Sequence, residues 1–377
     1  MSTINIGFIG YGNSAKFFHL PYVLSNPELQ VYAFLQRSPA PQDRAFVHPG
    51  THCTVDFPKA KHYRTSEEFF ADKNIELVIV CSKTDSHAEF AEKALKAGKH
   101  VVVEKPFTRS SEEADRLITL AKEKEKILTV YQSDRRWDGD FKTLQYLLEK
   151  DAFGTVTEAE IHYEFENPPW LPTLSATSYT PGSGFMFALG THTIDQALVL
   201  FGRPRSVTGF LRALRNVESE IEDTFTIILQ YDTALLVTIK TTIITPMQDQ
   251  LKYFIRGTKG SFIKVINYGT DPQEDHAISG MPSTDPQFGI ENERIHGLLT
   301  TYTEFDHQSQ VYDPKSEKYT GRIPTVPGRI RGYYEHVVDA IRGRADLQVT
   351  SEESRDGIHI IELARKSQET GTTIPWS

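Results

Sequence analysis

The start of the chain joins an apolar strand to a glycine-rich turn, and this pairing restricts the possible folds more than any other feature. Residues 4–9 are typical of a buried strand, and a G-x-G-x-x-A sequence follows directly. Gly10 permits a tight turn, Gly12 lets the backbone approach a pyrophosphate, and Ala15 stands where a third glycine packs helix against strand. The next helix, expected over 14–24, offers its first N–H groups to phosphates. Because the turn lies between a strand and a helix, it predicts a dinucleotide site rather than an ordinary Gly-rich turn. The residues expected to contact the cofactor here are Gly10, Tyr11, Gly12, Asn13, Ser14 and Ala15.

The first 131 residues alternate strand-like and helix-like stretches, which indicates a parallel sheet with helices on its faces. From Val156 the pattern changes to long strands with short turns, which favours a largely antiparallel open sheet. We therefore predict an α/β protein with a doubly wound Rossmann domain over 1–131. A second α/β domain with a large open, mostly antiparallel sheet is expected over 132–377. Its C-terminal helices are candidates for packing back on the first domain.

The individual elements follow from local periodicity and from turn residues. Strands of the first domain are expected at 4–9, 31–35, 77–81, 100–103 and 127–131. Strands of the second are expected at 156–165, 206–214, 223–230, 234–242, 251–256 and 261–266. Helices are expected at 87–96, after Ser110, and at 140–148, 193–200, 330–341 and 352–367. Residues 257–260 predict a hairpin turn. Residues 267–328 show no clear period, so we expect a long functional loop there.

Net charge and cysteine content exclude several classes of protein. The net charge of −9 argues against non-specific binding of nucleic acid or of an anionic membrane. Cys53 and Cys81 are too few for a disulfide framework, and the chain lacks a signal-peptide or membrane-span pattern, so a cytoplasmic location is expected. His48, His52 and His62 occur near Cys53, but the spacing fits no known metal motif, and no metal is expected.

The end of the second strand indicates which nucleotide is bound. An NAD site usually has an Asp or Glu there for the ribose 2′-hydroxyl. This chain has Gln36-Arg37-Ser38 instead. Arg37 and Ser38 are suited to holding a 2′-phosphate by charge-assisted hydrogen bonds, which favours NADP(H). In the alternative, Arg37 stacks on the adenine and NAD(H) is accepted as well.

Two further segments follow strands of the same domain. Small polar residues after the strand at 77–81 are expected to line the crevice under the ribose and nicotinamide; they are Cys81, Ser82, Lys83, Thr84 and His87. The simpler alternative is that Asp85 or Ser86 only caps the next helix.

Glu104-Lys105-Pro106 follows the strand at 100–103. The proline holds the preceding residue in extended geometry, so the Lys105 ammonium is positioned stiffly. Beside a dinucleotide, this group is suited to polarising a hydroxyl or carbonyl, with Glu104 holding the ribose or orienting the lysine. In the alternative, Lys105 makes a structural ion pair.

In the second domain, residues 182–195 precede and begin the helix at 193–200. Thr191 or Thr193 is expected to cap this helix, and His192 and Asp195 are expected on one helical face. A histidine at a helix N-terminus facing a cleft is suited to general acid or base chemistry. In the alternative, His192 is a hydrogen-bonded histidine of the core with a structural role only.

Arg136 belongs to an Arg-Arg-Trp-Asp sequence between the domains. It is a candidate for holding cofactor or substrate, or for an interdomain salt-bridge hub. Tyr163 and Trp170 are candidates for lining a sugar pocket, although core packing is the more ordinary role.

Together these residues resemble the glucose–fructose oxidoreductase/inositol dehydrogenase (Gfo/Idh/MocA) family over nearly the whole chain. The resemblance rests on the glycine turn, the His87–Pro106 block, Gly190-Thr191-His192 and the C-terminal helices. The residues at 18–21, 135–138, 194–198 and 268–274 are similar to the scyllo-inositol dehydrogenase-like branch. The family implies sugar or polyol substrates and homodimers or homotetramers formed through the second sheet.

The resemblance also implies roles for individual residues. Lys105 matches the family's catalytic lysine and His192 its catalytic histidine, and both are expected to contact substrate. Many members have an aspartate four residues before that histidine, where this chain has Ala188. Asp195 and Glu166 are the acids proposed to compensate. Residues 163–166 lack the arginine expected for inositol.

The main hypothesis is therefore an NADP-dependent oxidoreductase of a secondary alcohol or ketone of a sugar or polyol. The rival is a nucleotide-binding regulatory protein of the same fold that has lost the reaction, which Ala188 favours. A third possibility is a redox-neutral enzyme that recycles a tightly held nucleotide.

Overall fold

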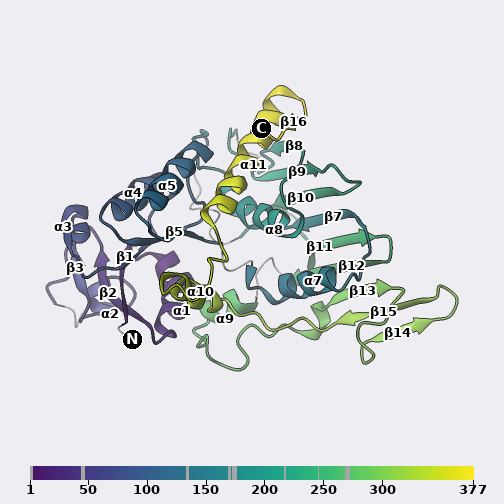
Figure 1. Ribbon diagram of the computed structural model, residues 1–377, viewed down its shortest axis with the longest axis horizontal. Coiled ribbons are helices and arrows are strands. Elements are labelled where there is room, and N and C mark those ends of the chain that lie inside the picture. The colour runs from purple at the N-terminus through teal and green to yellow at the C-terminus, as the bar shows by residue number, and fades with distance from the viewer. Residues whose placement is uncertain are drawn as a thin grey trace. The chain divides into compact units, whose positions relative to one another are not determined.

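The computed structural model describes residues 3–43, 47–132, 136–168, 171, 176–215, 218–244, 246–267 and 272–377. The chain divides into two compact units. The first contains Met1–Asp134, His276–Pro286 and Ile330–Arg355, and the second contains Arg135–Asp275, Gln287–Arg329 and Asp356–Ser377. Each unit is built on one sheet (Figure 1).

The first unit contains a six-stranded parallel sheet in the order β3-β2-β1-β4-β5-β6. Its strands are β1 (Ile4–Ile9), β2 (Leu29–Leu35), β3 (Lys61–Tyr63), β4 (Leu77–Val80), β5 (His100–Glu104) and β6 (Leu128–Tyr131). All four residues of β4 are buried, as expected for a strand covered on both faces. This order and direction confirm the predicted doubly wound sheet.

Helices cover both faces of this sheet, with α4 and α5 side by side in Figure 1. The helical elements of the first unit are η1 (Ser14–His19), α1 (Leu20–Leu24), α2 (Cys53–Asp56), α3 (Ser66–Ala71), η3 (Thr84–Ser86), α4 (His87–Lys96), α5 (Ser111–Glu123) and α10 (Gly332–Ile341). Ser110 begins α5 as expected, because its hydroxyl accepts a hydrogen bond from the Glu113 N–H. The helix expected over 14–24 is a π-helical turn, η1, followed by the short α1.

The second unit contains a ten-stranded sheet in the order β14-β15-β13-β12-β11-β7-β10-β9-β8-β16. Only β7 and β10 pair in parallel among its described strands; the other pairs are antiparallel, as expected. Its strands are β7 (Val156–His162), β8 (Ser206–Arg212), β9 (Thr224–Gln230), β10 (Leu236–Thr242), β11 (Asp249–Gly257), β12 (Gly260–Asn267), β13 (Gly297–Thr301), β14 (Gln310–Asp313), β15 (Lys318–Ile323) and β16 (Ile374–Pro375).

The helical elements α7 (Gly139–Glu149), η5 (Met186–Gly190), α8 (Thr191–Phe201) and η6 (Glu293–Ile295) belong to the second unit. Two helices, α9 (Pro272–Ile278) and α11 (Ser351–Thr370), include residues of both units. The prediction of one long loop over 267–328 is wrong in its secondary structure, because α9, η6 and β13 to β15 lie within these residues. Across the described residues, every helix is too short or too polar to cross a membrane.

Candidate functional site

The predicted nucleotide-binding residues follow the carboxyl ends of β1, β2, β4 and β5. Parallel strands present these ends at one edge of the sheet, and the chain order reverses between β1 and β4. In open α/β sheets, ligands bind at such a reversal, outside the carboxyl ends of the strands. The first unit therefore brings the four predicted segments to the edge where a dinucleotide is expected.

The glycine turn has the geometry that a pyrophosphate requires. Gly10 has φ = +96°, and a Cβ added there would lie 2.8 Å from the Cys81 carbonyl oxygen, so a side chain is excluded. A Cβ at Gly12 would meet nothing within 4 Å. The space above Gly12 is therefore open to a ligand that approaches the backbone, which fits a phosphate.

Glu104 connects the glycine turn to Lys105. Its Oε1 accepts a hydrogen bond from the Ser14 hydroxyl at 2.7 Å, and its Oε2 accepts one from the Lys105 backbone N–H at 2.7 Å. His19 Nε2 lies 3.3 Å from the same carboxylate. Burial acts to raise the pKa of Glu104, but the hydrogen bond and charge of His19, the charge of Lys105 and the Ser14 hydroxyl together lower it to about 2. Glu104 is thus a buried anion at neutral pH.

His19 and Tyr334 support the Glu104 carboxylate, and the sequence did not predict either residue as part of the site. His19 is fully buried, and its Nδ1 lies 2.5 Å from the Tyr334 hydroxyl. Tyr334 lies on α10, more than 300 residues further along the chain, and burial raises its pKa well above the usual value. In the sequence, His19 was noted only as part of residues 18–21, which resemble the scyllo-inositol dehydrogenase-like branch. No local sequence pattern indicated a role for Tyr334.

The segment after β4 is tied to the Lys105 turn by His87. Its Nδ1 lies 2.8 Å from the Pro106 carbonyl oxygen and its Nε2 lies 3.0 Å from that of Ser82. Ser86 occupies the N-cap position of α4, as the capping alternative expected, but its side chain makes no capping hydrogen bond. Thr84–Ser86 form the 3-10 turn η3, and the Ser86 hydroxyl donates to the Lys83 carbonyl.

Cys81, which begins this segment, is buried, and burial followed by the charge of Glu104 raises its thiol pKa well above the usual value. Its thiol is therefore neutral at physiological pH. The exposed Lys83 and half-buried Thr84 of the same segment remain predicted cofactor contacts.

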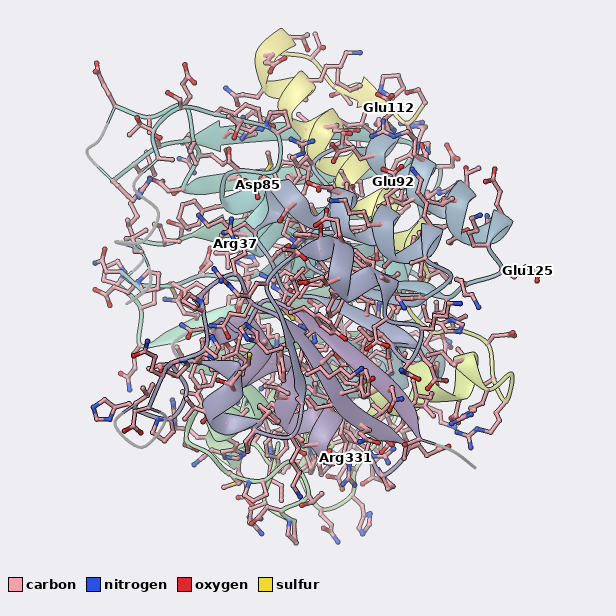
Figure 2. All side chains as sticks on the ribbon, turned by 90° about the vertical axis from the view of Figure 1, so that its left-hand side faces the viewer. Arg37, Asp85, Glu92, Glu112, Glu125 and Arg331 are labelled. Atoms are coloured by element: carbon pink, nitrogen blue, oxygen red, sulfur yellow. The ribbon has the colours of Figure 1, made fainter. Side chains whose placement is uncertain are left out.

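The end of β2 carries a basic group and no carboxylate. Arg37 is exposed (Figure 2), and its guanidinium makes no hydrogen bond or ion pair within the described ranges. Its backbone carbonyl accepts a hydrogen bond from Arg64 Nε at 3.2 Å. Ser38 is also exposed, whereas the Gln36 side chain is occupied by the Cys53 N–H. Arg37 and Ser38 therefore present free polar groups at the position where a 2′-phosphate is expected.

In the second unit, η5 runs directly into α8. Gly190 at the junction has helical dihedrals, so the predicted capping position does not exist. The Thr191 and Thr193 hydroxyls donate back to the carbonyls of Phe187 and Gly190. The prediction that one of them caps the helix is wrong.

His192 lies in the first turn of α8 and is 3% exposed. Its ring packs edge-on against Tyr163, with ring centroids 5.7 Å apart. The second unit thus brings together two predicted substrate residues from different elements. The third, Trp170, lies outside the described residues.

The two acids expected to compensate for Ala188 are placed differently. Arg136 donates two hydrogen bonds to Asp195, Nε to Oδ2 at 2.8 Å and Nη2 to Oδ1 at 2.6 Å, and both side chains are buried. This ion pair lies within the second unit, and the cofactor, substrate and interdomain roles of Arg136 stay predictions. Glu166 is exposed and forms an isolated bridge with Ile244, whereas His192 is buried.

A buried glutamate anchors the segment before His192. Glu222 Oε1 accepts the Met186 N–H at 3.0 Å, and a Cβ at Gly184, where φ is +100°, would lie 2.5 Å from this carboxylate. Glu222 also pairs with Arg365, whose guanidinium lies over the Tyr179 ring. Burial raises the pKa of Glu222, although Arg365 opposes this effect.

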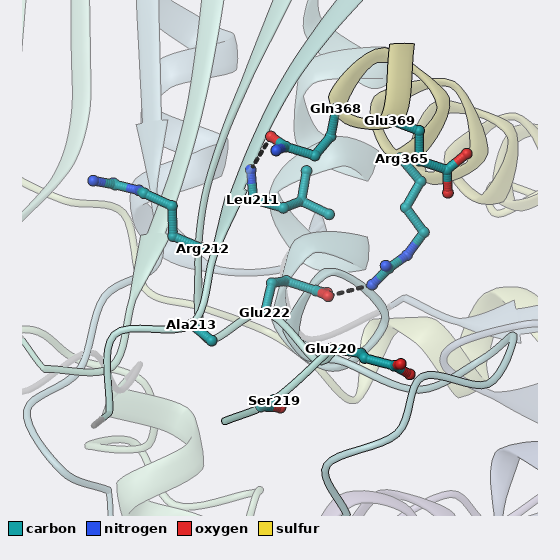
Figure 3. Close-up of a pocket in the computed structure, with 9 residues that line it drawn as sticks. All are labelled: Leu211, Arg212, Ala213, Ser219, Glu220, Glu222, Arg365, Gln368 and Glu369. Carbon is teal, nitrogen blue, oxygen red and sulfur yellow. Dashed lines mark hydrogen bonds and ion pairs between the residues drawn. The ribbon is translucent and has the colours of Figure 1, made fainter. Parts of the chain in front are cut away.

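Figure 3 shows Glu222 and Arg365 at a pocket of about 160 Å³, formed by the end of β8, the 219–222 loop and α11. This pocket contains none of the predicted site residues.

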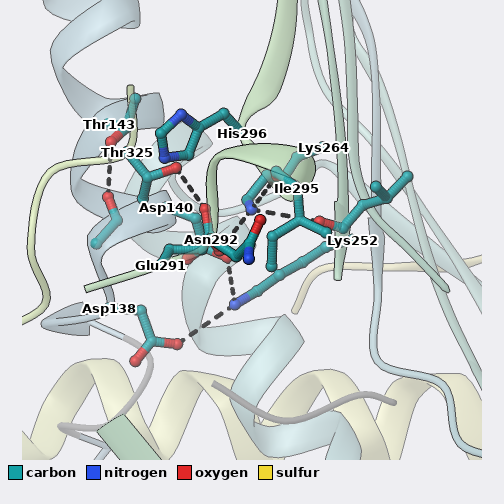
Figure 4. A network of polar contacts seen from close by, with 12 residues as sticks. Asp138, Asp140, Thr143, Lys252, Lys264, Glu291, Asn292, Ile295, His296 and Thr325 are labelled. Atoms are coloured by element: carbon teal, nitrogen blue, oxygen red, sulfur yellow. Dashed lines mark hydrogen bonds and ion pairs between the residues drawn. The ribbon is translucent and has the colours of Figure 1, made fainter. Parts of the chain in front are cut away.

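A second buried charge cluster supports the sheet of this unit (Figure 4). Lys252 Nζ lies 2.6 Å from Asp140 and 3.4 Å from Asp138. Lys264 Nζ lies 2.6 Å from Glu291 and donates to the Ile295 carbonyl. Asp138, which belongs to the Arg-Arg-Trp-Asp sequence, therefore has a structural ion pair. This cluster joins α7, β11 and β12 to the segment that leads into β13.

Comparisons with known proteins agree with this arrangement. The family model "Oxidoreductase family, NAD-binding Rossmann fold" matches residues 4–132, and that of the GFO/IDH/MocA C-terminal domain matches residues 141–263. An uncharacterized oxidoreductase of Schizosaccharomyces pombe is 36% identical over 99% of this chain and 100% of its own length. The scyllo-inositol 2-dehydrogenase (NADP(+)) IolW of Bacillus subtilis is 33% identical over 99% of this chain and 96% of its own. The solved structure of the Bacillus subtilis oxidoreductase yvaA has a TM-score of 0.85 and 33% identity, covering 100% of this chain and 99% of that one.

Proposed function

The chain belongs to the Gfo/Idh/MocA family of oxidoreductases, and on this premise we propose that it transfers hydride between NADP(H) and a secondary alcohol or ketone of a sugar or polyol. The single observation that carries the proposal is the path from the glycine turn through Glu104 to Lys105. Because one buried carboxylate accepts hydrogen bonds from Ser14 and from the Lys105 backbone, the lysine has a fixed position relative to the nucleotide turn.

The choice of NADP rests on the end of β2. A 2′-phosphate needs donors and positive charge, and Arg37 and Ser38 supply both, with no acid among Gln36, Arg37 and Ser38 to repel it. The relative IolW of Bacillus subtilis carries NADP(+) in its name. NAD(H) is expected to bind more weakly through the same glycine turn.

In the proposed reaction, the bound nicotinamide supplies the hydride acceptor or donor. The Lys105 ammonium polarises the substrate oxygen and stabilises the negative charge that develops there when the hydroxyl proton is removed, or, in the reverse direction, when hydride reaches the carbonyl carbon. In the oxidation direction, the hydroxyl proton passes to the protein, with His192 proposed as its carrier. Tyr163 packs against His192 and is proposed to orient its ring.

The rival function keeps nucleotide binding without turnover, and one observation favours it. Ala188 replaces the acid that many relatives place near the histidine, while Arg136 occupies both carboxylate oxygens of Asp195 and Glu166 is exposed. Asp195 and Glu166 are therefore poorly placed to replace the aspartate that is missing at position 188. In the proposed reaction, most of the catalysis is assigned to Lys105.

One experiment separates the two functions. Purified protein is mixed with NADP and a panel of sugars and polyols, and with NADPH and a panel of keto-sugars, while nicotinamide absorbance is followed. The proposal expects turnover with at least one polyol or keto-sugar and a lower KM for NADP than for NAD. Tight NADP binding with no absorbance change across both panels would instead support the regulatory protein.

We also propose that the protein forms a homodimer or homotetramer through the ten-stranded sheet. Paired residues place Glu158, Leu236, Phe254 and Ile263 on one face, where Leu236 and Ile263 are 38% and 41% exposed. Light scattering after size-exclusion chromatography tests the assembly, and Ile263→Asp should shift it towards the monomer. A monomeric wild type would contradict the proposed assembly.

We also propose a cytoplasmic location for the protein.

A further inference from the structure

Beside the segment that follows β2, three metal-ligating side chains come together that the proposed reaction does not use. They are His52, Cys53 and His62, and their ligand atoms all lie within 4.8 Å of one another. His52 and Cys53 are 5% and 1% exposed, and His62, on β3, is half-buried. We propose that this cluster is a binding site for a borderline or soft transition-metal ion such as Zn²⁺.

The donor set suits such an ion. Imidazole nitrogen and thiolate sulfur are the ligands that zinc prefers, at about 2.0–2.1 Å for nitrogen and about 2.3 Å for sulfur. Movements of about an ångström gather three atoms at these separations onto one ion. The cluster has three members among the described residues, so a tetrahedral ion keeps one position for water or a further ligand. The half-buried His62 marks the side from which an ion enters.

The atoms around the two rings supply a second, independent argument. A histidine that binds metal through one nitrogen usually donates the other N–H to an oxygen, which fixes the tautomer and the ring orientation. His62 Nε2 lies 2.9 Å from the Gln36 carbonyl oxygen, which leaves Nδ1 with its lone pair for a metal. An oxygen partner also faces one nitrogen of His52, since its Nδ1 lies 2.9 Å from the Thr54 hydroxyl.

His52 must change tautomer to bind. In the structure its Nδ1 accepts the Thr54 N–H at 3.2 Å, and its Nε2 faces the Ser38 carbonyl at 3.3 Å. With a metal on Nε2, the proton moves to Nδ1 and is donated to the Thr54 hydroxyl. The contact of Nε2 with the Ser38 carbonyl and the hydrogen bond from the Thr54 N–H to Nδ1 are then lost. The Cys53 thiol loses its proton on binding, so metal affinity should rise with pH.

The two cysteines of the chain provide a matched pair for the test, because both are buried and only Cys53 belongs to the cluster. The full chain is purified under reducing conditions without a polyhistidine tag, stripped with EDTA and titrated with Co²⁺ in the absence of nucleotide. We expect one equivalent of Co²⁺ to give tetrahedral ligand-field bands and a thiolate-to-cobalt charge-transfer band, both of which Zn²⁺ abolishes.

Cys53→Ser should lose the charge-transfer band, whereas Cys81→Ser should keep it. His62→Gln, at the half-buried edge, should weaken Co²⁺ binding by at least about tenfold with the circular dichroism spectrum unchanged. The proposal is overturned if the wild type gives no cobalt spectrum, if the band survives in Cys53→Ser, or if it disappears only in Cys81→Ser. Because nucleotide is absent, these outcomes do not depend on the dehydrogenase reaction.

Discussion

Two buried glutamates, one in each unit, have pKa values shifted in opposite directions, although burial acts to raise both. Glu104 and Glu291 are 6% and 8% exposed. The pKa of Glu104 is lowered to about 2, because hydrogen bonds from His19 and Ser14 and the charges of His19 and Lys105 outweigh burial. The pKa of Glu291 is raised, because burial and the charge of Asp140 outweigh Lys264 and Thr325.

The difference shows that burial alone does not decide the charge of an interior carboxylate. The residues with the largest effects on the Glu104 carboxylate are His19, Lys105 and Ser14, and all three stabilise its anion. Glu291 belongs to a cluster in which Asp138, Asp140 and Glu291 share two lysines. We infer that the residues around Glu104 keep a negative charge beside the glycine turn. The cluster around Glu291, by contrast, holds separate chain segments together.

The largest effect expected from this contrast is on turnover. If Glu104 and Lys105 serve chemistry, Lys105→Ala should lower kcat by about 10²–10⁴-fold. NADP affinity, measured by titration calorimetry, and the thermal midpoint should change little, because the variant leaves in place the hydrogen bonds that Glu104 accepts from the Lys105 backbone N–H and from the Ser14 hydroxyl. Lys73→Ala, which removes an exposed lysine of the same unit, is the control. Wild-type kcat in Lys105→Ala would end the catalytic assignment.

The next effect concerns stability in the second unit. Lys264→Met removes the ammonium that lies 2.6 Å from Glu291 and leaves this acid buried beside Asp140. Urea unfolding should show a loss of about 3–5 kcal/mol. Lys240→Met breaks the partly exposed pair with Glu160 and should cost under about 1 kcal/mol. Equal losses in the two variants would contradict the view that this cluster joins the segments.

The pH dependence of stability sharpens the contrast further. The folded-state pKa of Glu104 is about 2 against an ordinary 4.5, so its contribution is fully present above about pH 4.5. It is lost as the pH falls towards 2, at a total of about 3 kcal/mol. The stability difference between wild type and Glu104→Gln should therefore increase with pH across this window. Because the pKa of Glu291 is raised, the difference between wild type and Glu291→Gln should decrease as pH rises above about 4.5. Urea unfolding at a series of pH values measures both slopes, and slopes of the same sign would refute the comparison.

The smallest effect concerns cofactor choice. Arg37→Ala removes the exposed guanidinium at the end of β2 and should weaken NADP binding by about 10–100-fold, as expected for a hydrogen bond to a charged group. NAD affinity should be nearly unchanged. Arg64→Ala, which removes only a hydrogen bond to the Arg37 carbonyl, should have a smaller effect. An equal loss of NADP and NAD affinity in Arg37→Ala would show that the guanidinium does not recognise the 2′-phosphate.

The sequence predicted what short-range patterns encode. The buried runs of β1, β4 and β5, the glycine turn and the β11–β12 hairpin lie where periodicity and turn residues place them. The strands between 297 and 323 were missed. In β14 three of four residues are exposed, so the alternation that identifies a half-buried strand is absent. The π-helical register of η1 was also missed, because apolar spacing does not distinguish it over six residues.

For the candidate site, the predictable part is the part that lies in motifs. Ser14, Glu104 and Lys105 stand in sequence patterns, whereas Tyr334 and Glu222 reach the sites through tertiary contacts made over long stretches of chain. The same holds for His52, Cys53 and His62. Their spacing matches no metal motif, and they meet only because α2 begins beside the end of β3.

The pairing of His19 with Tyr334 has a consequence for biosynthesis. The first unit is assembled from three separate stretches of chain, and its last stretch begins at Ile330. When the six parallel strands have left the ribosome, the partner of His19 has yet to be translated. The nucleotide-binding half therefore acquires its complete interior only near the end of synthesis, and a nascent chain halted at residue 140 should remain open to proteases and chaperones.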